Sequence, residues 1–392
     1  MYGIIKNQPS YTLLDLIKYF LKLGTTGFGG PVALVGYMHR DLVEDKKWIN
    51  ESDYKEGLAL SQLAPGPLAA QLGIYLGYVH YGVLGATLSG LAFVLPSFLM
   101  VVLLGVAYRA YGGLPWMQAV FYGISAAVIG IIVLSSYKLT VKSISKFEIS
   151  AIKNNWLLWI FYVAAIIFTA VTEKEEVLLF IALGLIYMIV KAPPEWIKRP
   201  KVVFYLLIGK ISFSAVEIGK LGDIAWFFTK AGAFVFGSGL AIVPFLHVGV
   251  VNEYGWLTEN QFVDAVAVAM ITPGPVVISV GFIGYLVAGF PGACVAALAT
   301  FLPCYLFTII PAPYFKKIAQ NNSIKAFVDG ITAAVIGALV GAVIVISTRS
   351  LIDLPTILIA VATVLILIYN KKIQEPYIIG IASIIGILIK LT

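Results

Sequence analysis

Residues 61–71 read SQLAPGPLAAQ and place two prolines and a glycine inside a long apolar segment. Proline and glycine are the residues least compatible with a continuous helix. A helix that restarts after such a break presents unpaired backbone N–H groups and the positive end of its dipole. Because that combination attracts anions, the chemistry predicted here is recognition of a negatively charged solute by backbone groups.

The same triplet returns later in the chain, since Pro65-Gly66-Pro67 matches Pro273-Gly274-Pro275 at an offset of 208, the difference between 273 and 65. A second break, LGTTGFGGPVA at 23–33, is matched by AGAFVFGSGLA at 231–241. Lipid tolerates broken helices only where protein buries them or where they line a watery cavity. Single kinks are common in membrane helices, but paired breaks at corresponding positions indicate a transporter's central site near the midplane.

Two lysines at matched positions add full positive charge to these breaks. Lys22 and Lys230 each stand two residues before the first glycine of their break, and snorkelling to the membrane interface is the alternative explanation. Polar side chains beside the PGP turns either donate hydrogen bonds to the solute or pack helices together. The substrate-binding candidates are therefore Lys22, Gly29, Gly30, Pro31, Ser61, Pro65, Gly66, Pro67, Gln71, Lys230, Gly237, Ser238, Gly239, Thr272, Pro273, Gly274, Pro275 and Ser279.

Four titratable residues are candidates for proton coupling. Glu56 and Asp264 each precede a PGP triplet by nine residues, which is about 13 Å along a helix and places them nearer the interface than the midplane. Helix capping or a salt bridge explains these carboxylates equally well. His39 and His247 end the first broken segment of each half, where a histidine is either a proton-linked switch or an interfacial residue without a role.

The elements that position these residues are membrane helices. Of the 392 residues, 60% are hydrophobic and 12% are charged, whereas soluble domains carry about 25% charged residues. We expect an all-α polytopic integral membrane protein with twelve or thirteen spans and no secretory signal peptide. The apolar segments fall at roughly 12–37, 56–79, 82–108, 116–137, 155–172, 177–191, 202–218, 224–250, 262–287, 290–313, 326–347, 354–369 and 376–391.

Charge and cysteine content exclude several function classes. The net charge of +7 fits the lysine and arginine excess of cytoplasmic loops, so no nucleic-acid partner is expected. Cys294 and Cys304 have no metal-ligand spacing and are expected as free thiols in a membrane helix. With three histidines and no cluster of ligands, neither a metal nor a cofactor is predicted.

The chain consists of two homologous halves, about 1–200 and 201–392. From residue 77 onward the offset changes from 208 to 207, and the run GISAAVIG at 123–130 then meets GITAAVIG at 330–337. One gap in more than a hundred positions indicates an internal repeat. The alignment pairs Lys22, His39, Trp48, Glu51 and Glu56 with Lys230, His247, Trp256, Glu259 and Asp264.

Loop charges favour an inverted-topology repeat. The loops 138–153 and 191–201 are rich in lysine, which places them in the cytoplasm. Inversion also places the five lysines of 314–325 and 370–375 inside and leaves Arg349 and Lys390 outside, whereas a parallel repeat reverses that balance. Inversion requires an odd number of crossings between equivalent points, so either 202–218 spans the membrane or one broken segment per half is re-entrant.

The motifs FGGP (28–31), ALSQLAPGPLAAQLGIYLGY (59–78) and MITPGPVVISVGFIGY (270–285) resemble those of the chromate ion transporter family in its long-chain, two-domain form. The resemblance covers essentially the whole chain and implies one chromate-transporter repeat in each half. It also implies antiparallel halves, chromate efflux, chromate resistance, and sulfate as a competitor or alternative substrate, with proton motive force as the supposed energy source. The motif residues carried over are Gly29, Gly30, Pro31, Pro65, Gly66 and Pro67, while the second half departs with Gly237-Ser238-Gly239.

We therefore expect a secondary transporter that exports a tetrahedral divalent oxyanion across the cytoplasmic membrane of a prokaryote, coupled to an ion gradient. The alternatives are a transporter of sulfate or another oxyanion, and an anion channel lined by the same breaks. The absence of a GxxxxGK(S/T) loop argues against ATP-driven pumping by this chain. The scarcity of His, Cys and clustered carboxylates argues against a membrane-embedded enzyme, and a homodimer is compatible with the pattern.

Overall fold

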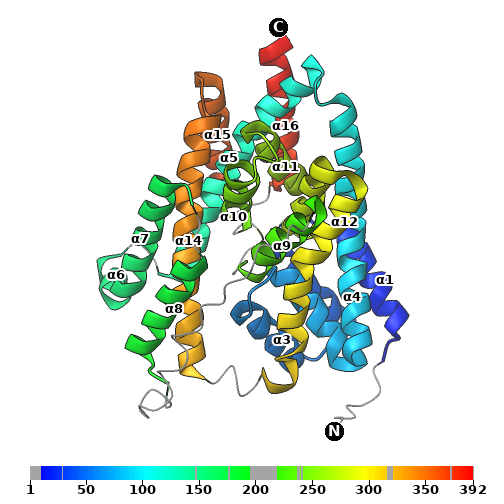
Figure 1. Cartoon of the computed structure of the whole chain (residues 1–392). Helices are drawn as coiled ribbons and strands as arrows, with labels where there is room; N and C mark the ends of the chain where they lie inside the picture. The colour runs from blue at the N-terminus through cyan, green and yellow to red at the C-terminus, as the bar shows by residue number, and fades with distance from the viewer. Residues whose placement is uncertain are drawn as a thin grey trace.

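The computed structural model describes residues 10–28, 30–145, 148–174, 177–194, 219–235, 239, 242–315, 321–370 and 373–391. Within these ranges every regular element is a helix (Figure 1). The expected span at 202–218 lies outside the described residues. Because several helices are long and apolar enough to cross a membrane, the chain is a multi-pass membrane protein; these helices are Leu68–Tyr111, Pro115–Ser143, Val276–Tyr314 and Asn322–Ser350.

The order of elements repeats between the halves. Each half has an entry helix, a short helix that ends in a π-helical turn, a helix before the PGP triplet, two long helices and a closing pair of shorter apolar helices. The first half contains α1 Leu13–Thr26, α2 Gly30–His39, the π-helical turn Arg40–Asp45, α3 Glu51–Leu63, α4 Leu68–Tyr111, α5 Pro115–Ser143, α6 Ile149–Asn154, α7 Trp156–Thr172 and α8 Val177–Lys191. The second contains α9 Lys220–Ala233, α10 Ile242–His247, the π-helical turn Val248–Glu253, α11 Glu259–Ile271, the 3-10 turns Val276–Ile278 and Ala312–Tyr314, α12 Ser279–Ile309, α14 Asn322–Ser350, α15 Leu354–Tyr369 and α16 Glu375–Leu391.

The two longest helices each fold back on themselves at a glycine. In α4 the backbone leaves helical geometry at Gly82, where φ is 58°, and a Cβ on Gly77 would lie 2.3 Å from the Gly85 carbonyl oxygen. Residues eight apart lie about 12 Å apart in a straight helix, so this contact requires two antiparallel segments. In α12 the kink at Gly289 produces the same close approach between Gly284 and Gly292.

The first PGP triplet also turns the chain back. Helix α3 ends at Leu63 and α4 begins at Leu68. Gly57, in the middle of α3, packs against the Leu72 and Tyr75 side chains of α4 so closely that a Cβ on Gly57 would meet the Tyr75 ring. Positions about equally far before and after the triplet are therefore in contact, as in a helical hairpin.

Equivalent long helices of the two halves pack against each other in opposite directions. Early in the second segment of α4, the Thr87 hydroxyl lies 2.7 Å from the Tyr305 hydroxyl of α12. Later in that segment, the rings of Phe98 and Phe290 lie 6.5 Å apart. Residue numbers increase along α4 in the direction in which they decrease along α12, so the two helices run antiparallel (Figure 1).

The closing helix pairs are exchanged between the halves. The run GISAAVIG in α5 packs against α16 at Gly123 and against α15 at Gly130. Its repeat GITAAVIG in α14 packs against α8 at Gly330 and against α7 at Gly337. Small residues permit such close contact between membrane helices, which explains why both runs contain two glycines, two alanines and a serine or threonine.

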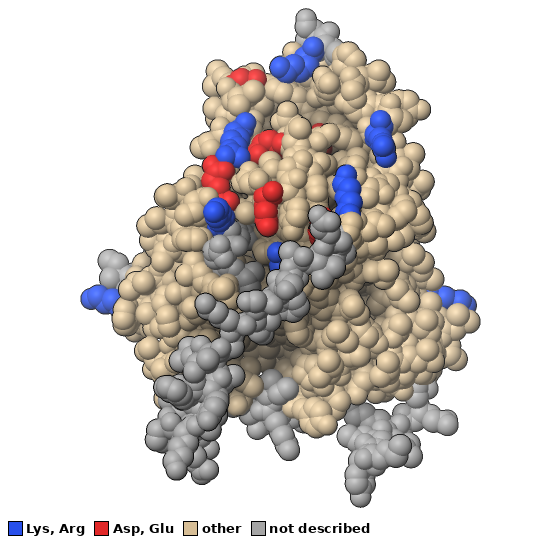
Figure 2. All heavy atoms as spheres, viewed as in Figure 1, with Lys and Arg blue, Asp and Glu red and all other residues tan. Residues whose placement is uncertain are grey.

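The surface agrees with a membrane location. Figure 2 shows Lys, Arg, Asp and Glu gathered over the upper half of one face, while most of the remaining described surface in view is uncharged. Large apolar side chains on the long helices are exposed, including Leu103 in α4 at 68% and Leu298 in α12 at 66%. Exposed leucines at this density are suited to contact with lipid.

Candidate functional site

The broken segments of the two halves meet each other crosswise. The Gly66 N–H donates to the Val235 carbonyl oxygen over 2.5 Å, and the Gly274 N–H donates to the Gly27 carbonyl oxygen over 2.8 Å. Gly66 and Gly274 are equivalent at the repeat offset of 208, and so are Gly27 and Val235. Each PGP turn is therefore tied to the first break of the opposite half, in the reciprocal pattern that a two-fold relation produces.

Glycine is required at both turns. Gly66 has φ at +144° and Gly274 has φ at +95°, values that other residues adopt rarely. A Cβ on Gly66 would lie 3.1 Å from the Cys304 sulfur, and a Cβ on Gly274 would lie 2.0 Å from the Ser97 hydroxyl oxygen. Ser97 and Cys304 are equivalent at the offset of 207 and belong to the long helix of the opposite half. Cys304 is a buried free thiol.

The hydrogen bonds at the turns leave the two glycine N–H groups occupied by protein carbonyls in this structure. The Gln71 amide nitrogen donates to the Pro65 carbonyl oxygen over 2.9 Å, while the buried Gln71 Oε1 has no hydrogen-bond partner among the described residues. The Ser61 and Thr272 hydroxyls donate to carbonyl oxygens four residues earlier in their own helices. The glycine N–H groups and these hydroxyls thus stabilise the breaks themselves.

The first breaks are described in part. Gly30 begins α2 with φ at +71°, Pro31 follows it, and Gly239 lies against the Val276 and Val277 side chains that follow the second PGP triplet. The predicted residues Gly29, Gly237 and Ser238 lie outside the described residues. Pro67 and Pro275 precede the first helical residue of their segments, while buried Ser279 opens α12.

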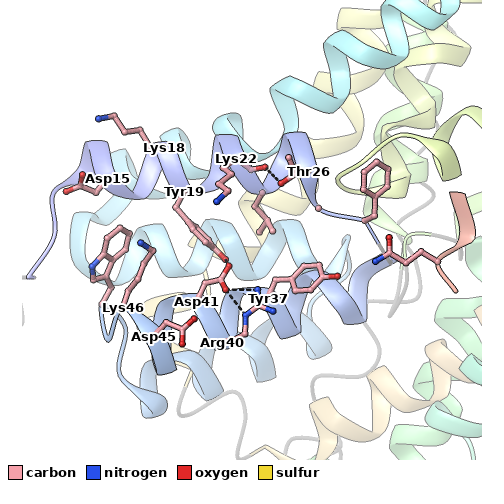
Figure 3. A pocket seen from close by; sticks show the side chains of 15 residues that line it. Asp15, Lys18, Tyr19, Lys22, Thr26, Tyr37, Arg40, Asp41, Asp45 and Lys46 are labelled. Atoms are coloured by element: carbon pink, nitrogen blue, oxygen red, sulfur yellow. Dashed lines mark hydrogen bonds and ion pairs between the residues drawn. The ribbon is translucent and has the colours of Figure 1, made fainter. Parts of the chain in front are cut away.

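Lys22 lines a charged cavity of about 770 Å³ that runs along α1. One wall is α1, from Asp15 to Thr26, and the wall continues through Gly27 and Phe28 of the first break. Figure 3 shows Lys22 and Tyr19 reaching from α1 toward Arg40 and Asp41 of the π-helical turn. The lining contains four basic and three acidic side chains, which are Lys18, Lys22, Arg40, Lys46, Asp15, Asp41 and Asp45.

Arg40 and Asp41 of this cavity are paired with each other, whereas Lys18 and Lys22 have no ion-pair partner among the described residues. Asp41 accepts a 2.8 Å ion pair from Arg40 and a hydrogen bond from the Tyr19 hydroxyl over 3.3 Å. Lys46 lies 4.6 Å from the centre of the Trp48 ring. Within the part of the chain that the structure describes, the Lys22 ammonium has no ion-pair partner, so its charge is available to a bound anion.

Lys230 lines the equivalent cavity of the second half, of about 700 Å³. Part of the lining matches the first cavity at the offset of 208, but two charged residues are replaced, since Val248 stands where the first half has Arg40 and Gly249 where it has Asp41. Lys230 lies 5.6 Å from the centre of the Trp226 ring. The two cavities therefore have lining residues at equivalent positions but differ in charge.

The aligned histidines and glutamates form matched pairs. His39 lies 2.9 Å from Glu51, and His247 lies 2.7 Å from Glu259. Each pair joins the end of the first broken segment to the start of the helix before the PGP triplet. The second pair is extended by Arg349, which also contacts Glu259 and pairs with Glu173. The pairs therefore act as ties between neighbouring segments.

The aligned carboxylates Glu56 and Asp264 have different surroundings. Asp264 is buried on α11 and accepts hydrogen bonds from Tyr108 over 2.7 Å and from Ser125 over 3.2 Å. Glu56 is bonded to Tyr75 of its own hairpin. The sequence reading missed Tyr108 and Ser125, although Ser125 lies inside the repeated GISAAVIG run.

Comparison with known proteins decides the family. A family model described as chromate transporter matches residues 14–189 and 222–387, one match in each half. The chain belongs to the chromate transporter family. No solved structure matches this chromate transporter family member significantly.

Relatives extend over nearly the whole of this family member. A chromate transport protein of Cupriavidus metallidurans is 61% identical, over 98% of this chain and 95% of the relative. A probable chromate transport protein of Synechococcus elongatus is 59% identical, over 98% of both chains. A chromate transport protein of Pseudomonas aeruginosa is 30% identical over 85% of this chain and 80% of its own length.

Proposed function

We propose that this protein is a secondary transporter that exports chromate across the cytoplasmic membrane of a prokaryote, driven by an ion gradient. The observation that carries the proposal is the charged cavity along α1, whose lining reaches Gly27, the residue that accepts the hydrogen bond of the second PGP turn. It offers an anion a charged path to the point where the broken segments meet. The relatives named as chromate transport proteins support chromate as the anion.

The oxyanion is recognised mainly by side chains of the cavity. Lys22 supplies an unpartnered ammonium group, and Arg40 supplies planar N–H donors that can be shared between Asp41 and a bound oxyanion. Lys230 supplies the matched charge in the second cavity. The PGP turns hold the breaks in place, and their N–H groups become available to the anion when the crosswise hydrogen bonds open.

The two halves have inverted topology in this proposal. The antiparallel contact between α4 and α12 supports it, because equivalent spanning helices that run in opposite directions cross the membrane in opposite directions. The reciprocal bonds Gly66–Val235 and Gly274–Gly27 fit a two-fold axis in the membrane plane. The lysine count of the loops favours the same arrangement.

Alternating access follows from this arrangement. Residues 1–200 and 201–392 act as the two repeats, and each closing helix pair packs against the long helix of the other repeat. Rocking of one helical bundle against the other exposes one cavity and closes the other. Sulfate, which has the same charge and a similar shape, competes with chromate at the same site.

Purified protein in liposomes tests this proposal. We expect labelled chromate to enter liposomes preloaded with unlabelled chromate faster than empty ones, because exchange requires a carrier that returns loaded. Excess sulfate is expected to slow the exchange. A rate of chromate entry that does not depend on the preloaded chromate would indicate a channel. Exchange of sulfate without exchange of chromate would assign a different oxyanion as substrate.

A further inference from the structure

A third cavity, of about 940 Å³, surrounds a buried carboxyl group that anion recognition does not use. Asp264 lies on α11 and is 6% exposed. Its Oδ2 accepts a hydrogen bond from the Tyr108 hydroxyl of α4, and its Oδ1 accepts one from the Ser125 hydroxyl of α5. Three helices from both halves therefore converge on one carboxyl group.

No positive charge neutralises this carboxyl group within the part of the chain that the structure describes. Arg349 of α14 lines the same cavity but is paired with Glu173 and Glu259. Lys390 of α16 also lines it, and its ammonium lies 4.4 Å from the centre of the Tyr122 ring of α5. Arg109 of α4, which follows Tyr108 in sequence, completes the basic lining.

The Tyr122 hydroxyl of the lining also has a partner of its own. The Tyr122 hydroxyl donates to Asp353 over 2.7 Å. Helix α12 contributes Leu286 to the cavity and packs the Phe282 ring against Tyr108, so it adds no charge there. A buried carboxylate that has only hydroxyl partners is costly, whereas a protonated carboxyl group is not. The cavity connects this group to water, from which a proton can arrive.

The position of Asp264 links it to the second PGP turn. Helix α11 carries Asp264 and ends at Ile271, two positions before Pro273 of the triplet. Tyr108, the closer hydroxyl partner, lies with its ring centre 5.5 Å from that of Phe282, which follows the triplet on α12. A change in the charge of Asp264 therefore acts on both arms of the segment that contacts Gly27.

We propose that Asp264 binds the proton that couples anion transport to the proton gradient, and that the third cavity supplies it. This inference rests on the proposed transport function. The proton moves between cavity water and a carboxylate oxygen of Asp264. In the protonated state Ser125 and Tyr108 remain hydrogen-bonded to the neutral carboxyl group of Asp264. In the charged state both hydroxyls donate to the carboxylate.

The first half provides a matched control. Glu56 occupies the equivalent position but is only half-buried, and it is hydrogen-bonded to Tyr75 of the same hairpin. The proposal therefore assigns coupling to Asp264 and not to Glu56. Tyr108→Phe and Ser125→Ala remove one hydroxyl partner each and leave the carboxyl group in place.

The test measures chromate accumulation and chromate exchange in liposomes that contain wild-type protein, Asp264→Asn or Glu56→Gln. We expect Asp264→Asn to lose accumulation driven by a proton gradient at least tenfold while exchange at equal pH persists, and Glu56→Gln to retain both. Tyr108→Phe and Ser125→Ala are expected to shift the pH midpoint of accumulation. If Asp264→Asn fails to reach the membrane, the pH midpoints of Tyr108→Phe and Ser125→Ala test the inference instead.

Other results overturn the inference. Accumulation by Asp264→Asn with the wild-type pH profile contradicts it, as does an unchanged pH midpoint in both hydroxyl variants, or accumulation that follows a sodium gradient instead. Infrared spectra of the wild type and Asp264→Asn in membranes separate this inference from the transport proposal. A carboxylic acid band that titrates in the wild type and is missing in the variant supports the proton site even where chromate is not carried, and its absence from the wild type contradicts the site.

Discussion

The Gly66 N–H donates to the Val235 carbonyl oxygen, and this bond joins the PGP turn of one half to the broken segment of the other. Its counterpart between Gly274 and Gly27 makes the arrangement reciprocal. The first break of each half is thereby held against the PGP turn of the other half. The breaks are thus joined structural elements and not independent kinks.

A methyl group at either turn is expected to break this junction. Gly274→Ala places Cβ 2.0 Å from the Ser97 hydroxyl oxygen, and both turns use φ values that alanine avoids at a cost of about 1–3 kcal/mol. We expect Gly66→Ala and Gly274→Ala to lower thermal stability in detergent and to reduce transport. The matched control is Gly36→Ala in α2, where nothing lies within 4 Å of the added Cβ. Equal stability of all three variants would argue against the junction.

Removal of the Lys22 charge is expected to weaken anion binding. A hydrogen bond to a charged group contributes about 1.5–3 kcal/mol, so Lys22→Gln is expected to raise the chromate concentration for half-maximal transport by about tenfold or more. Lys230→Gln tests the equivalent charge in the second cavity. Transport kinetics in vesicles measure both, and unchanged affinity in the two variants would remove the lysines from the site.

Arg40 offers a test in which the repeat supplies the substitution. Arg40→Val introduces the residue that the second half carries at the equivalent position, Val248. We expect weaker chromate affinity and weaker dependence on ionic strength, because a cation is lost from the cavity. Asp41 loses its ion-pair partner in this variant, so Arg40→Lys, which retains the charge, is the control. Equal affinity of Arg40→Val and wild type would exclude Arg40 from anion recognition.

Labelling from the two sides of the membrane tests inverted topology. Gly113 lies between α4 and α5, and Asn321, one residue after the position equivalent to Gly113, lies directly before α14. After replacement of Cys294 and Cys304 by serine, we expect Gly113→Cys and Asn321→Cys to react with an impermeant thiol reagent from opposite faces. Reaction from the same face would favour a parallel repeat.

Acid is expected to weaken the tie between His247 and Glu259. Burial raises the pKa of Glu259, but the hydrogen bond from His247 and the charge of Arg349 outweigh it and hold that pKa below its usual range. A carboxyl group of this kind stabilises the fold above its unfolded pKa, about 4.3, and loses that contribution as pH falls through the lower folded value. We expect Glu259→Gln to reduce the loss of thermal stability below about pH 4.3, and a parallel loss in variant and wild type would contradict it.

The sequence predicted much of the framework because repeated residues align without knowledge of the fold. The expected segments 177–191 and 354–369 coincide with α8 and α15. The alignment matched His39 with His247 and Glu51 with Glu259, but it did not predict that His39 and Glu51 lie 2.9 Å apart.

Contacts between the halves could not be predicted in the same way. An alignment pairs Gly66 with Gly274, but whether either touches Val235 or Gly27 depends on how the halves are oriented in space. For the same reason the partners of Asp264 were missed, since Tyr108 lies 156 positions away in sequence. The occupation of the glycine N–H groups by carbonyls is a consequence of this packing.

Export of chromate with the energy of an ion gradient is measured in everted membrane vesicles, in which export appears as uptake. Labelled chromate uptake is measured with and without a proton gradient, in vesicles from cells that express the protein and in vesicles from cells that lack it. We expect chromate to accumulate inside the vesicles above the external concentration, and this accumulation to collapse when the gradient is dissipated. Uptake that only equilibrates with the outside, with or without the gradient, would contradict the account.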